Sequence, residues 1–181
     1  RRRAKAVNFG IVYGISDYGL SRDLGISRKE AQEYIDLYYS RYPQVAEWHT
    51  VLLEQARKDG YVSTIFGRRR YLPDLNSRNY NLRSFAERMA MNAPIQGSAA
   101  DIIKIAMIHL AKEIQKQNLA SRMLLQVHDE LIFDMASEEQ ELLPQLVVDQ
   151  MEHAAVLSVP LVVDLKTGHN WYAMTKLDRS R

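Results

Sequence analysis

The sequence contains no cysteine, which excludes disulfide bonds, thiolate zinc sites and cysteine nucleophiles. It has no apolar run long enough to span a bilayer, and its first ten residues, RRRAKAVNFG, lead into no signal-peptide hydrophobic region. No internal repeat or low-complexity tract is present in its 181 residues, a length that suffices for one domain, or one and part of another, with its own core. We therefore expect a cytoplasmic protein with no membrane partner.

The net charge is also small, +2, but it is unevenly distributed along the chain. Residues 1–90 carry 16 Lys and Arg against 10 Asp and Glu, whereas residues 91–181 carry 8 against 12. This asymmetry is compatible with a basic surface for a polyanion beside an acidic site for cations. Unevenly distributed solvated charge explains it equally well.

The pattern of apolar residues predicts more helix than strand. A helix is expected over residues 1–14, and Ser27 with Glu30 forms the capping box of a second one. Pro43 starts a helix that ends near Gly60, in keeping with the preference for proline at the first helical position. A strand pair around Gly67 then predicts a hairpin whose tip is the run Arg68, Arg69 and Arg70.

The second half of the chain mixes the two element types. Helices are expected over residues 79–91, from Pro94 to about Gln117, and from Ser137 to Leu157 with a kink or split at Pro144. Strands are expected over residues 123–127, 130–134 and 160–165. Because helices and strands do not alternate regularly, we predict an α+β fold with an antiparallel sheet packed on helices.

The stretch LLQVHDELIF places His128, Asp129 and Glu130 between two strands that we expect to be buried. Burial of ionised groups is unfavourable unless they are paired, hydrogen-bonded or bound to metal. Mg²⁺ takes one or two protein carboxylates together with waters and substrate phosphates, which suits Asp129 and Glu130 at a turn. An ordinary polar turn is the alternative interpretation.

The stretch RRRAKAVNFGIVYG repeats a basic or aromatic residue every four positions: Arg1, Lys5, Phe9 and Tyr13. On a helix these residues share one broad face about 18 Å long, basic at one end and aromatic at the other. A nucleotide would meet cations at its phosphates and Phe9 at its base. An amphipathic core helix with solvated cations remains an open alternative.

The stretch NAPIQGSAADIIK combines the amides of Asn92 and Gln96, near the expected helix start, with small residues. Amide side chains donate and accept hydrogen bonds, as minor-groove readers require, and a helix start favours anions. Tight helix packing with a cap explains the same residues. The three arginines of the predicted hairpin tip are interpreted either as phosphate contacts or as a solvated turn.

Together, these stretches resemble family A of the DNA polymerases in bacteria. RRRAKAVNFGIVYG resembles its motif B in the fingers, and LLQVHDELIF resembles its motif C in the palm; GRRRYLPDLNSRN and RMAMNAPIQGSAADIIK are similar to further stretches. The resemblance covers essentially the whole chain. It implies a fingers portion over residues 1–60 and a C-terminal palm portion over residues 61–181.

The resemblance also implies a role for each candidate residue. Arg1 and Lys5 bind the triphosphate of the incoming deoxynucleotide, Phe9 stacks near its base, and Tyr13 stands where the template base enters. Asp129 is a ligand of two Mg²⁺ ions and Glu130 an adjacent carboxylate, with Lys5 completing the catalytic set. DNA contacts are implied for His128 at the primer terminus and for Asn92 and Gln96 in the minor groove. From their charge, Arg68, Arg69 and Arg70 remain further candidates for DNA contacts.

The implied reaction is template-directed transfer of a nucleotide to a primer 3′-hydroxyl by a two-metal mechanism. The partners are primer-template DNA and deoxynucleoside triphosphates. Motif A, which supplies a second Asp upstream of motif B, is missing, so we expect a fragment that is inactive alone and that self-associates through an exposed palm edge. A noncatalytic module that binds nucleic acid or nucleotides is the alternative.

Overall fold

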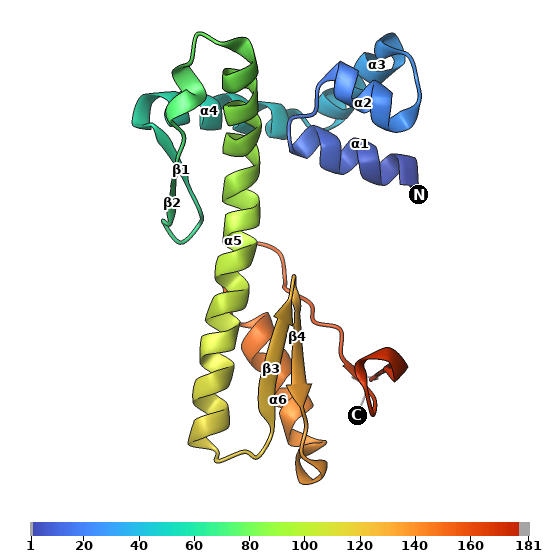
Figure 1. The fold of residues 1–181 in the computed structure, drawn as a ribbon, viewed down its shortest axis with the longest axis vertical. Coiled ribbons are helices and arrows are strands. Elements are labelled where there is room, and N and C mark those ends of the chain that lie inside the picture. The colour runs from blue at the N-terminus through green and yellow to red at the C-terminus, as the bar shows by residue number, and fades with distance from the viewer. Residues whose placement is uncertain (1, 178–181) are drawn as a thin grey trace. The chain divides into compact units, whose positions relative to one another are not determined.

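The computed structural model describes residues 2–177, with the side chains of residues 2 and 3 left aside, and divides into two compact units (Figure 1). Unit 1 comprises residues 1–98 and unit 2 residues 99–181. Both contain helices and antiparallel strand pairs, which confirms the α+β class. The predicted boundary between fingers and palm lies elsewhere, at residue 60, and that assignment stays a prediction.

Unit 1 is mainly helical. Its elements are α1 (Arg2–Val12), α2 (Asp17–Leu24), α3 (Arg28–Arg41), α4 (Pro43–Asp59), β1 (Tyr61–Ser63), β2 (Arg69–Tyr71), the 3₁₀ turn η1 (Pro73–Asn76) and the first part of α5 (Tyr80–Lys116). The capping box at the start of α3 is present: the Glu30 carboxylate accepts from the Ser27 amide, and the Ser27 hydroxyl from the Glu30 amide. Gly60 ends α4 in the left-handed conformation, as its sequence position predicts.

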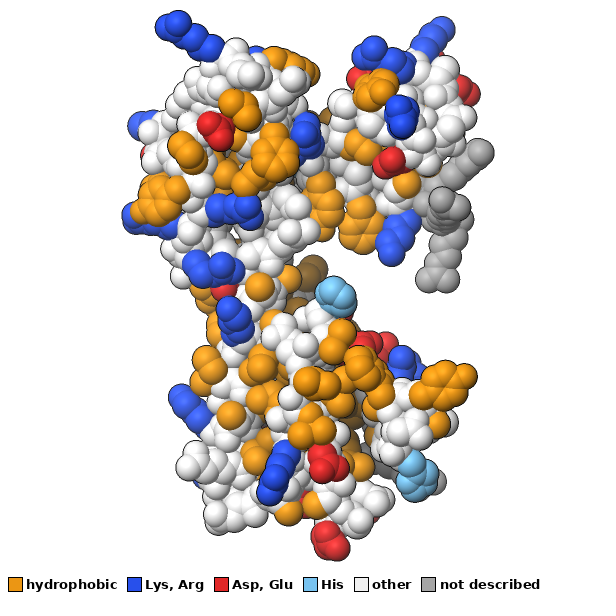
Figure 2. All heavy atoms as spheres, in the orientation of Figure 1, with side chains coloured by type: hydrophobic (Ala, Val, Ile, Leu, Met, Phe, Trp, Pro, Cys, Tyr) orange, Lys and Arg blue, Asp and Glu red, His pale blue; other side chains and the backbone are white. Residues whose placement is uncertain are grey.

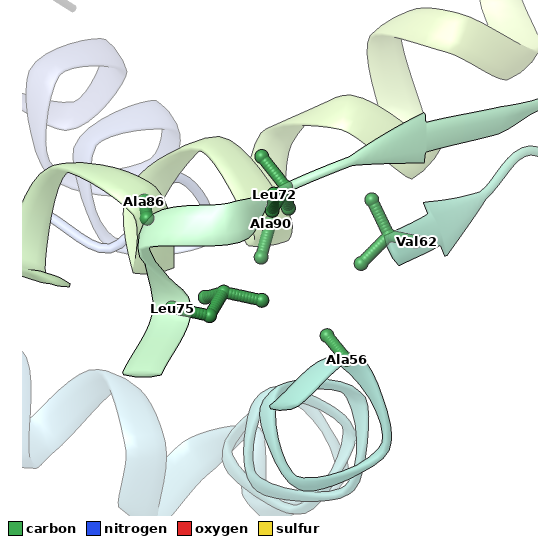
Figure 3. Packing of buried hydrophobic residues seen from close by; sticks show 6 residues of the cluster. All are labelled: Ala56, Val62, Leu72, Leu75, Ala86 and Ala90. Carbon is green, nitrogen blue, oxygen red and sulfur yellow. The ribbon is translucent and has the colours of Figure 1, made fainter. Parts of the chain in front are cut away.

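Two hydrophobic clusters hold unit 1 together. The first joins α1, α2 and α3 through the buried residues Ile11, Leu20, Ala31 and Ile35. The second joins α4, the β1–β2 hairpin and α5, and Figure 3 shows its side chains pointing toward one another: Ala56, Val62, Leu72, Leu75, Ala86 and Ala90. Small residues on α4 and α5 let the hairpin side chains fill the space between the helices.

Helix α5 corrects the prediction of two separate helices over 79–91 and from Pro94 onward. It is continuous for 37 residues, with Pro94 in its interior. Proline removes one helical hydrogen bond and costs about 3 kcal/mol in a helix interior. Burial on both sides of Pro94, at Ala90 and Met91 before it and Ile103 and Ala106 after it, outweighs that cost.

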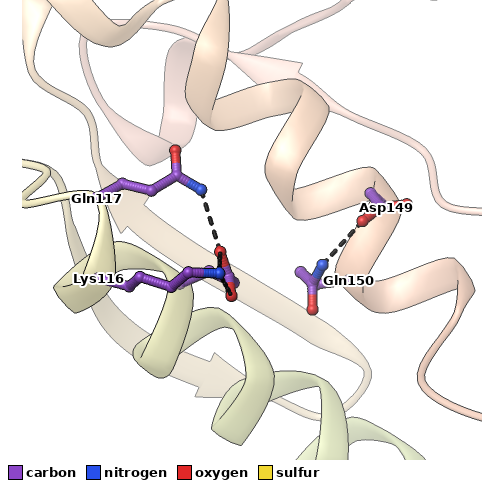
Figure 4. Close-up of polar contacts among 5 residues, drawn as sticks. Lys116, Gln117, Asp149 and Gln150 are labelled. Atoms are coloured by element: carbon purple, nitrogen blue, oxygen red, sulfur yellow. Dashed lines mark hydrogen bonds and ion pairs between the residues drawn. The ribbon is translucent and has the colours of Figure 1, made fainter.

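Unit 2 packs a β-hairpin on two helices. Strands β3 (Arg122–Val127) and β4 (Glu130–Asp134) pair antiparallel from Arg122↔Asp134 to Val127↔Glu130. Leu131 and Phe133 of β4 pack against Leu110 of α5 and the buried side chains of α6 (Leu142–Glu152). The chain also contains η2 (Ser137–Glu139), β5 (Lys166–Thr167), η3 (Trp171–Ala173) and β6 (Thr175–Lys176). At the C-terminal end of α5, Lys116 and Gln117 both donate hydrogen bonds to the Glu113 carboxylate (Figure 4).

Three expectations for local structure in the chain are wrong. Arg69 and Arg70 lie in β2, so the hairpin tip is formed by residues 65–67. The helix expected from Ser137 to Leu157 is shorter, because η2 precedes α6, and Pro144 falls in the first turn of α6, where its missing N–H has no partner to lose. Residues 160–165 alternate in burial as a strand would, but they form no strand ladder within the described residues.

The β3–β4 hairpin is also less buried than expected. A bulge at Leu124 interrupts the register, and Leu124 and Leu125 are 55% and 53% exposed. Figure 2 shows hydrophobic side chains gathered over unit 2, and Val159 and Val162 are among the exposed ones. The sheet has two strands among the described residues, so the outer edge of each strand has no strand partner there. No described helix is long and apolar enough to cross a membrane.

Candidate functional site

The turn of the β3–β4 hairpin presents two adjacent carboxylates to solvent. Val127 pairs with Glu130, which leaves His128 and Asp129 as a two-residue loop. His128 has a φ of 54°, the left-handed conformation that tight hairpin turns require at their first central position. Its carbonyl accepts a hydrogen bond of 3.0 Å from the Gln126 side chain. The side chains of Asp129 and Glu130 are exposed and have no hydrogen-bond or ion-pair partner among the described residues.

These two carboxylates fit part of a Mg²⁺ site rather than all of one. Hard oxygen ligands that are accessible and not neutralised are what Mg²⁺ takes while it keeps several waters. In the described part of the chain, no three His, Asp or Glu side chains converge into a group that could hold a metal ion. Further ligands would therefore have to come from substrate phosphates, water or other parts of the protein.

The exposed face of α1 brings three of the predicted nucleotide-binding residues together. The Lys5 ammonium lies 5.7 Å from the centre of the Phe9 ring, and the Phe9 and Tyr13 ring centres are 6.2 Å apart. Phe9 is 52% exposed, while Val7 and Ile11 pack into the core on the opposite face. Helix α1 is therefore amphipathic, with an apolar face in the core, and it also presents a basic and aromatic face to solvent. Arg1 lies outside the described residues.

The C-terminal end of α1 is fixed by a tight turn. Gly14 has a φ of 74°, and a Cβ there would lie 2.0 Å from the Met91 methyl group of α5. The Gly10 position has an internal explanation too, because a Cβ on it would lie 3.0 Å from the Ile15 side chain.

The β1–β2 hairpin lies against the middle of α5. The Ser98 hydroxyl accepts a hydrogen bond from the Ile65 amide at 3.0 Å, and a guanidinium nitrogen of Arg68 donates to the Gly97 carbonyl at 3.0 Å. A shallow hollow of about 80 Å³ between the two elements is lined by all three arginines and by Gln96. The small residues Gly97 and Ser98 thus let the hairpin pack closely against α5.

The three arginines differ in their surroundings. Besides the contact of Arg68 with Gly97, the Arg69 guanidinium lies 4.5 Å from the centre of the Tyr61 ring. Hydrogen bonding to Tyr71 is the main factor that raises the pKa of Arg69. Arg70 is exposed in β2. All three residues are exposed, but they do not form the tip.

Asn92 and Gln96 occupy the interior of α5 and not a helix start, which removes the helix N-terminus as an anion site. They are four residues apart and so lie on the same side of the helix. Gln96 is exposed. The side-chain oxygen of Asn92 is buried and has no hydrogen-bond partner among the described residues, a state that costs about 1–3 kcal/mol.

The candidate residues therefore fall into two sets. Unit 1 contains the face of α1 together with the hairpin arginines, Asn92 and Gln96, and unit 2 contains the turn with His128, Asp129 and Glu130. Sequence reasoning missed two further residues of unit 1. Ser98 anchors the hairpin, and the buried His49 contacts the end of α1; no local pattern marks either one, because their partners are 33 and 37 residues away.

Residues 1–173 match the sequence pattern of DNA polymerase family A. The chain belongs to this family. It is 59% identical over 172 residues to DNA polymerase I of Bacillus subtilis (strain 168), and 56% identical to that of Streptococcus pneumoniae (strain R6). In both cases 95% of the chain matches 20% of the relative, so the chain spans about a fifth of these proteins.

A solved structure of the family is similar in fold as well. The polymerase domain of Pol1 from M. smegmatis, in complex with DNA primer-template and dNTP, is 52% identical in sequence with a TM-score of 0.86. The similarity covers 88% of this chain and 28% of that one. The resemblance found in the sequence motifs is thus confirmed by sequence and structure comparisons.

Proposed function

We propose that the protein containing this chain is a DNA-directed DNA polymerase, which transfers a nucleotide from a deoxynucleoside triphosphate to a primer 3′-hydroxyl. The observation that carries this proposal is the similarity to a family A polymerase domain that binds primer-template and dNTP. At 52% identity and a TM-score of 0.86 over 88% of the chain, the fold is shared. Primer-template DNA and deoxynucleotides are the proposed partners.

In unit 2, Asp129 is the proposed metal ligand, with Glu130 beside it and His128 near the primer terminus. Support comes from the exposed, unpaired carboxylates on a turn that antiparallel strands hold at both sides. When bound, two Mg²⁺ ions would activate the primer hydroxyl and stabilise the negative charge on the leaving pyrophosphate. The remaining protein ligand would come from the part of the protein outside this chain.

In unit 1, the proposed nucleotide site is the exposed face of α1. Lys5 and Arg1 would bind the triphosphate as fixed positive charges, which stabilise charge that develops during phosphoryl transfer. Phe9 would stack on the base, since its ring is half exposed and lies beside Lys5. Tyr13, at the end of the same face, would stand next to the template base.

The middle of α5 and the β1–β2 hairpin form the proposed duplex contact. Arg68, Arg69 and Arg70 would meet phosphates, and such contacts make binding strongly salt-dependent. Asn92 and Gln96 would reach the minor groove, where amides can read acceptors common to all base pairs. The spacing of four residues, which places both amides on one side of α5, supports this proposal.

Replacing Asp129 by asparagine in the whole protein tests the proposal. Single-turnover nucleotide incorporation should fall by more than about a hundredfold, while the Kd for primer-template changes by less than about threefold, because a metal ligand acts mainly in the transition state. Asp134→Asn, at the exposed far end of the same hairpin, is the matched control and should stay near wild type. Incorporation within about tenfold of wild type would exclude Asp129 as a metal ligand, and a noncatalytic wild-type protein that binds DNA would favour the alternative module.

A further inference from the structure

The C-terminal end of α1 leaves no backbone carbonyl without a partner. The carbonyls of the last four helical positions all accept hydrogen bonds. Backbone amides supply three of them: Tyr13 donates to Phe9, Gly14 to Ile11 and Ile15 to Gly10. The imidazole of His49 donates to the fourth carbonyl, that of Val12. The bonds to Gly10 and Ile11, with Gly14 in the left-handed conformation, make a Schellman motif. Only the last carbonyl depends on a side chain, and that side chain comes from another helix.

His49 joins three helices of unit 1. Its Nε2 lies 3.0 Å from the Val12 carbonyl of α1, and its Nδ1 lies 3.4 Å from the Tyr39 hydroxyl of α3, while His49 itself belongs to α4. A carbonyl oxygen can only accept, so Nε2 carries the proton. In the neutral ring Nδ1 is then an acceptor, and the Tyr39 hydroxyl donates to it.

The surroundings of His49 favour the neutral ring. The residue is 6% exposed, and its ring centre lies 6.2 Å from that of Tyr39 and 5.1 Å from that of Trp48. The polar groups recorded against the imidazole are the Val12 carbonyl of α1 and the Tyr39 hydroxyl of α3, and no charged side chain is among them within the described residues. Burial raises the pKa of Tyr39, so this phenol stays neutral at physiological pH.

Burial is also the main cause that lowers the pKa of His49, and the hydrogen bond with Val12 opposes it only in part. The unfolded state therefore binds a proton more readily than the folded one. The stabilisation is complete above the ordinary histidine pKa of about 6.5 and is lost as the pH falls through the lower, folded value. Acidification thus favours conformations in which His49 leaves the end of α1.

We propose that His49 is a positioning residue that holds the C-terminal end of α1, and with it Tyr13, in place for nucleotide addition, and that protonation of His49 weakens this hold. The inference rests on the proposed function, because the position of α1 matters for activity only if that helix faces the nucleotide. His49 acts through the Val12 carbonyl and the adjacent Tyr13 and contacts no reacting group.

Two substitutions at His49 separate its hydrogen bond from its titration. His49→Gln keeps an N–H donor and removes the titrating ring, whereas His49→Leu removes both. His109→Gln, at an exposed histidine of α5 in unit 2, is the matched control. In the whole protein, kcat and KM for deoxynucleotide are measured from pH 5.5 to 8, together with the Kd for primer-template.

At pH 7.5, His49→Leu should raise KM for deoxynucleotide by about three- to tenfold, the equivalent of one buried hydrogen bond, with kcat and the Kd for primer-template little changed. His49→Gln should restore KM to within about twofold. Between pH 7.5 and 5.5 the wild-type KM should rise by about three- to tenfold more than that of His49→Gln. His109→Gln should follow the wild-type profile.

Amide hydrogen exchange in the whole protein provides a readout that does not need activity. The protection factors of the Tyr13, Gly14 and Ile15 amides should fall on acidification in wild type and stay constant in His49→Gln. If wild type incorporates no nucleotide, the proposed function fails, and the exchange data alone decide whether His49 holds α1. The same pH profiles of KM and of protection in wild type and His49→Gln would overturn the inference, even if His49→Leu does not fold.

Discussion

Ser98→Ala should loosen the β1–β2 hairpin without changing the hydrophobic core beneath it. The Ser98 hydroxyl is buried and makes two hydrogen bonds: it accepts from the Ile65 amide at 3.0 Å and donates to the Pro94 carbonyl at 2.5 Å. The Pro94 carbonyl keeps its helical bond from the Ser98 amide, so its loss is minor. The Ile65 amide loses its recorded partner, which costs about 1–2 kcal/mol in a partly buried setting.

The predicted loss is measured by native-state hydrogen exchange in the whole protein. The Thr64 and Leu72 amides, bonded to the Arg68 and Gly60 carbonyls, report the opening of the hairpin without contacting Ser98. They should exchange about 5- to 30-fold faster, because each 1.4 kcal/mol is a factor of ten. Ser40→Ala removes a similar hydroxyl on α3 that bonds only the Leu37 carbonyl, so it is the matched control. Unchanged exchange in Ser98→Ala would refute the view that this hydroxyl anchors the hairpin.

Three further predictions concern the charged groups. Lys5→Ala in the whole protein should remove about 2–4 kcal/mol of transition-state stabilisation, measured as a lower kcat/KM for deoxynucleotide, with little change in duplex affinity. The reverse pattern in steady-state kinetics and DNA titration would place Lys5 on the duplex. Hydrogen bonds from Ser121, and then from the Ala120 amide, lower the pKa of Glu139. The contribution of Glu139 to stability is therefore complete above the ordinary glutamate pKa and is lost as the pH falls through the lower folded value. Acid unfolding of Glu139→Gln should be less steep than that of wild type. The 181-residue chain alone should give no primer extension with Mg²⁺ and four deoxynucleotides, because its candidate metal ligands come from one hairpin. Sedimentation at several concentrations should show that it self-associates through an exposed edge of the β3–β4 sheet.

Local rules predicted those parts of the fold in which the deciding contacts are close in sequence. The capping box of Ser27 and Glu30 and the glycine after α4 both act within a few residues. The predicted helix break at Pro94 is wrong because the burial of side chains before and after Pro94 in α5 outweighs the local cost of the proline. The strand predicted over residues 160–165 is absent because a strand requires a hydrogen-bonded partner strand, and an alternating burial pattern does not provide one.

The same division applies to the candidate site. A spacing of four residues was enough to place Lys5, Phe9 and Tyr13 on one face of α1, since helix geometry alone determines it. Hairpin pairing around His128 and Asp129 followed from two apolar runs separated by a polar pair. The contact of His49 with Val12 joins positions 37 residues apart through tertiary packing, and nothing in either local sequence predicts it.

The close fit between the hairpin and α5 couples two positions in evolution. A Cβ at Gly97 would lie 2.6 Å from the Thr64 methyl carbon, so Gly97→Ala alone forces the two elements apart. Thr64→Ser would remove that methyl group while it keeps the hydroxyl that accepts from the Phe66 and Arg68 amides. Among natural variants, a larger residue at position 97 should therefore occur together with a smaller one at position 64. The order of the two changes should also be constrained, with the smaller side chain at position 64 arising before the larger one at position 97.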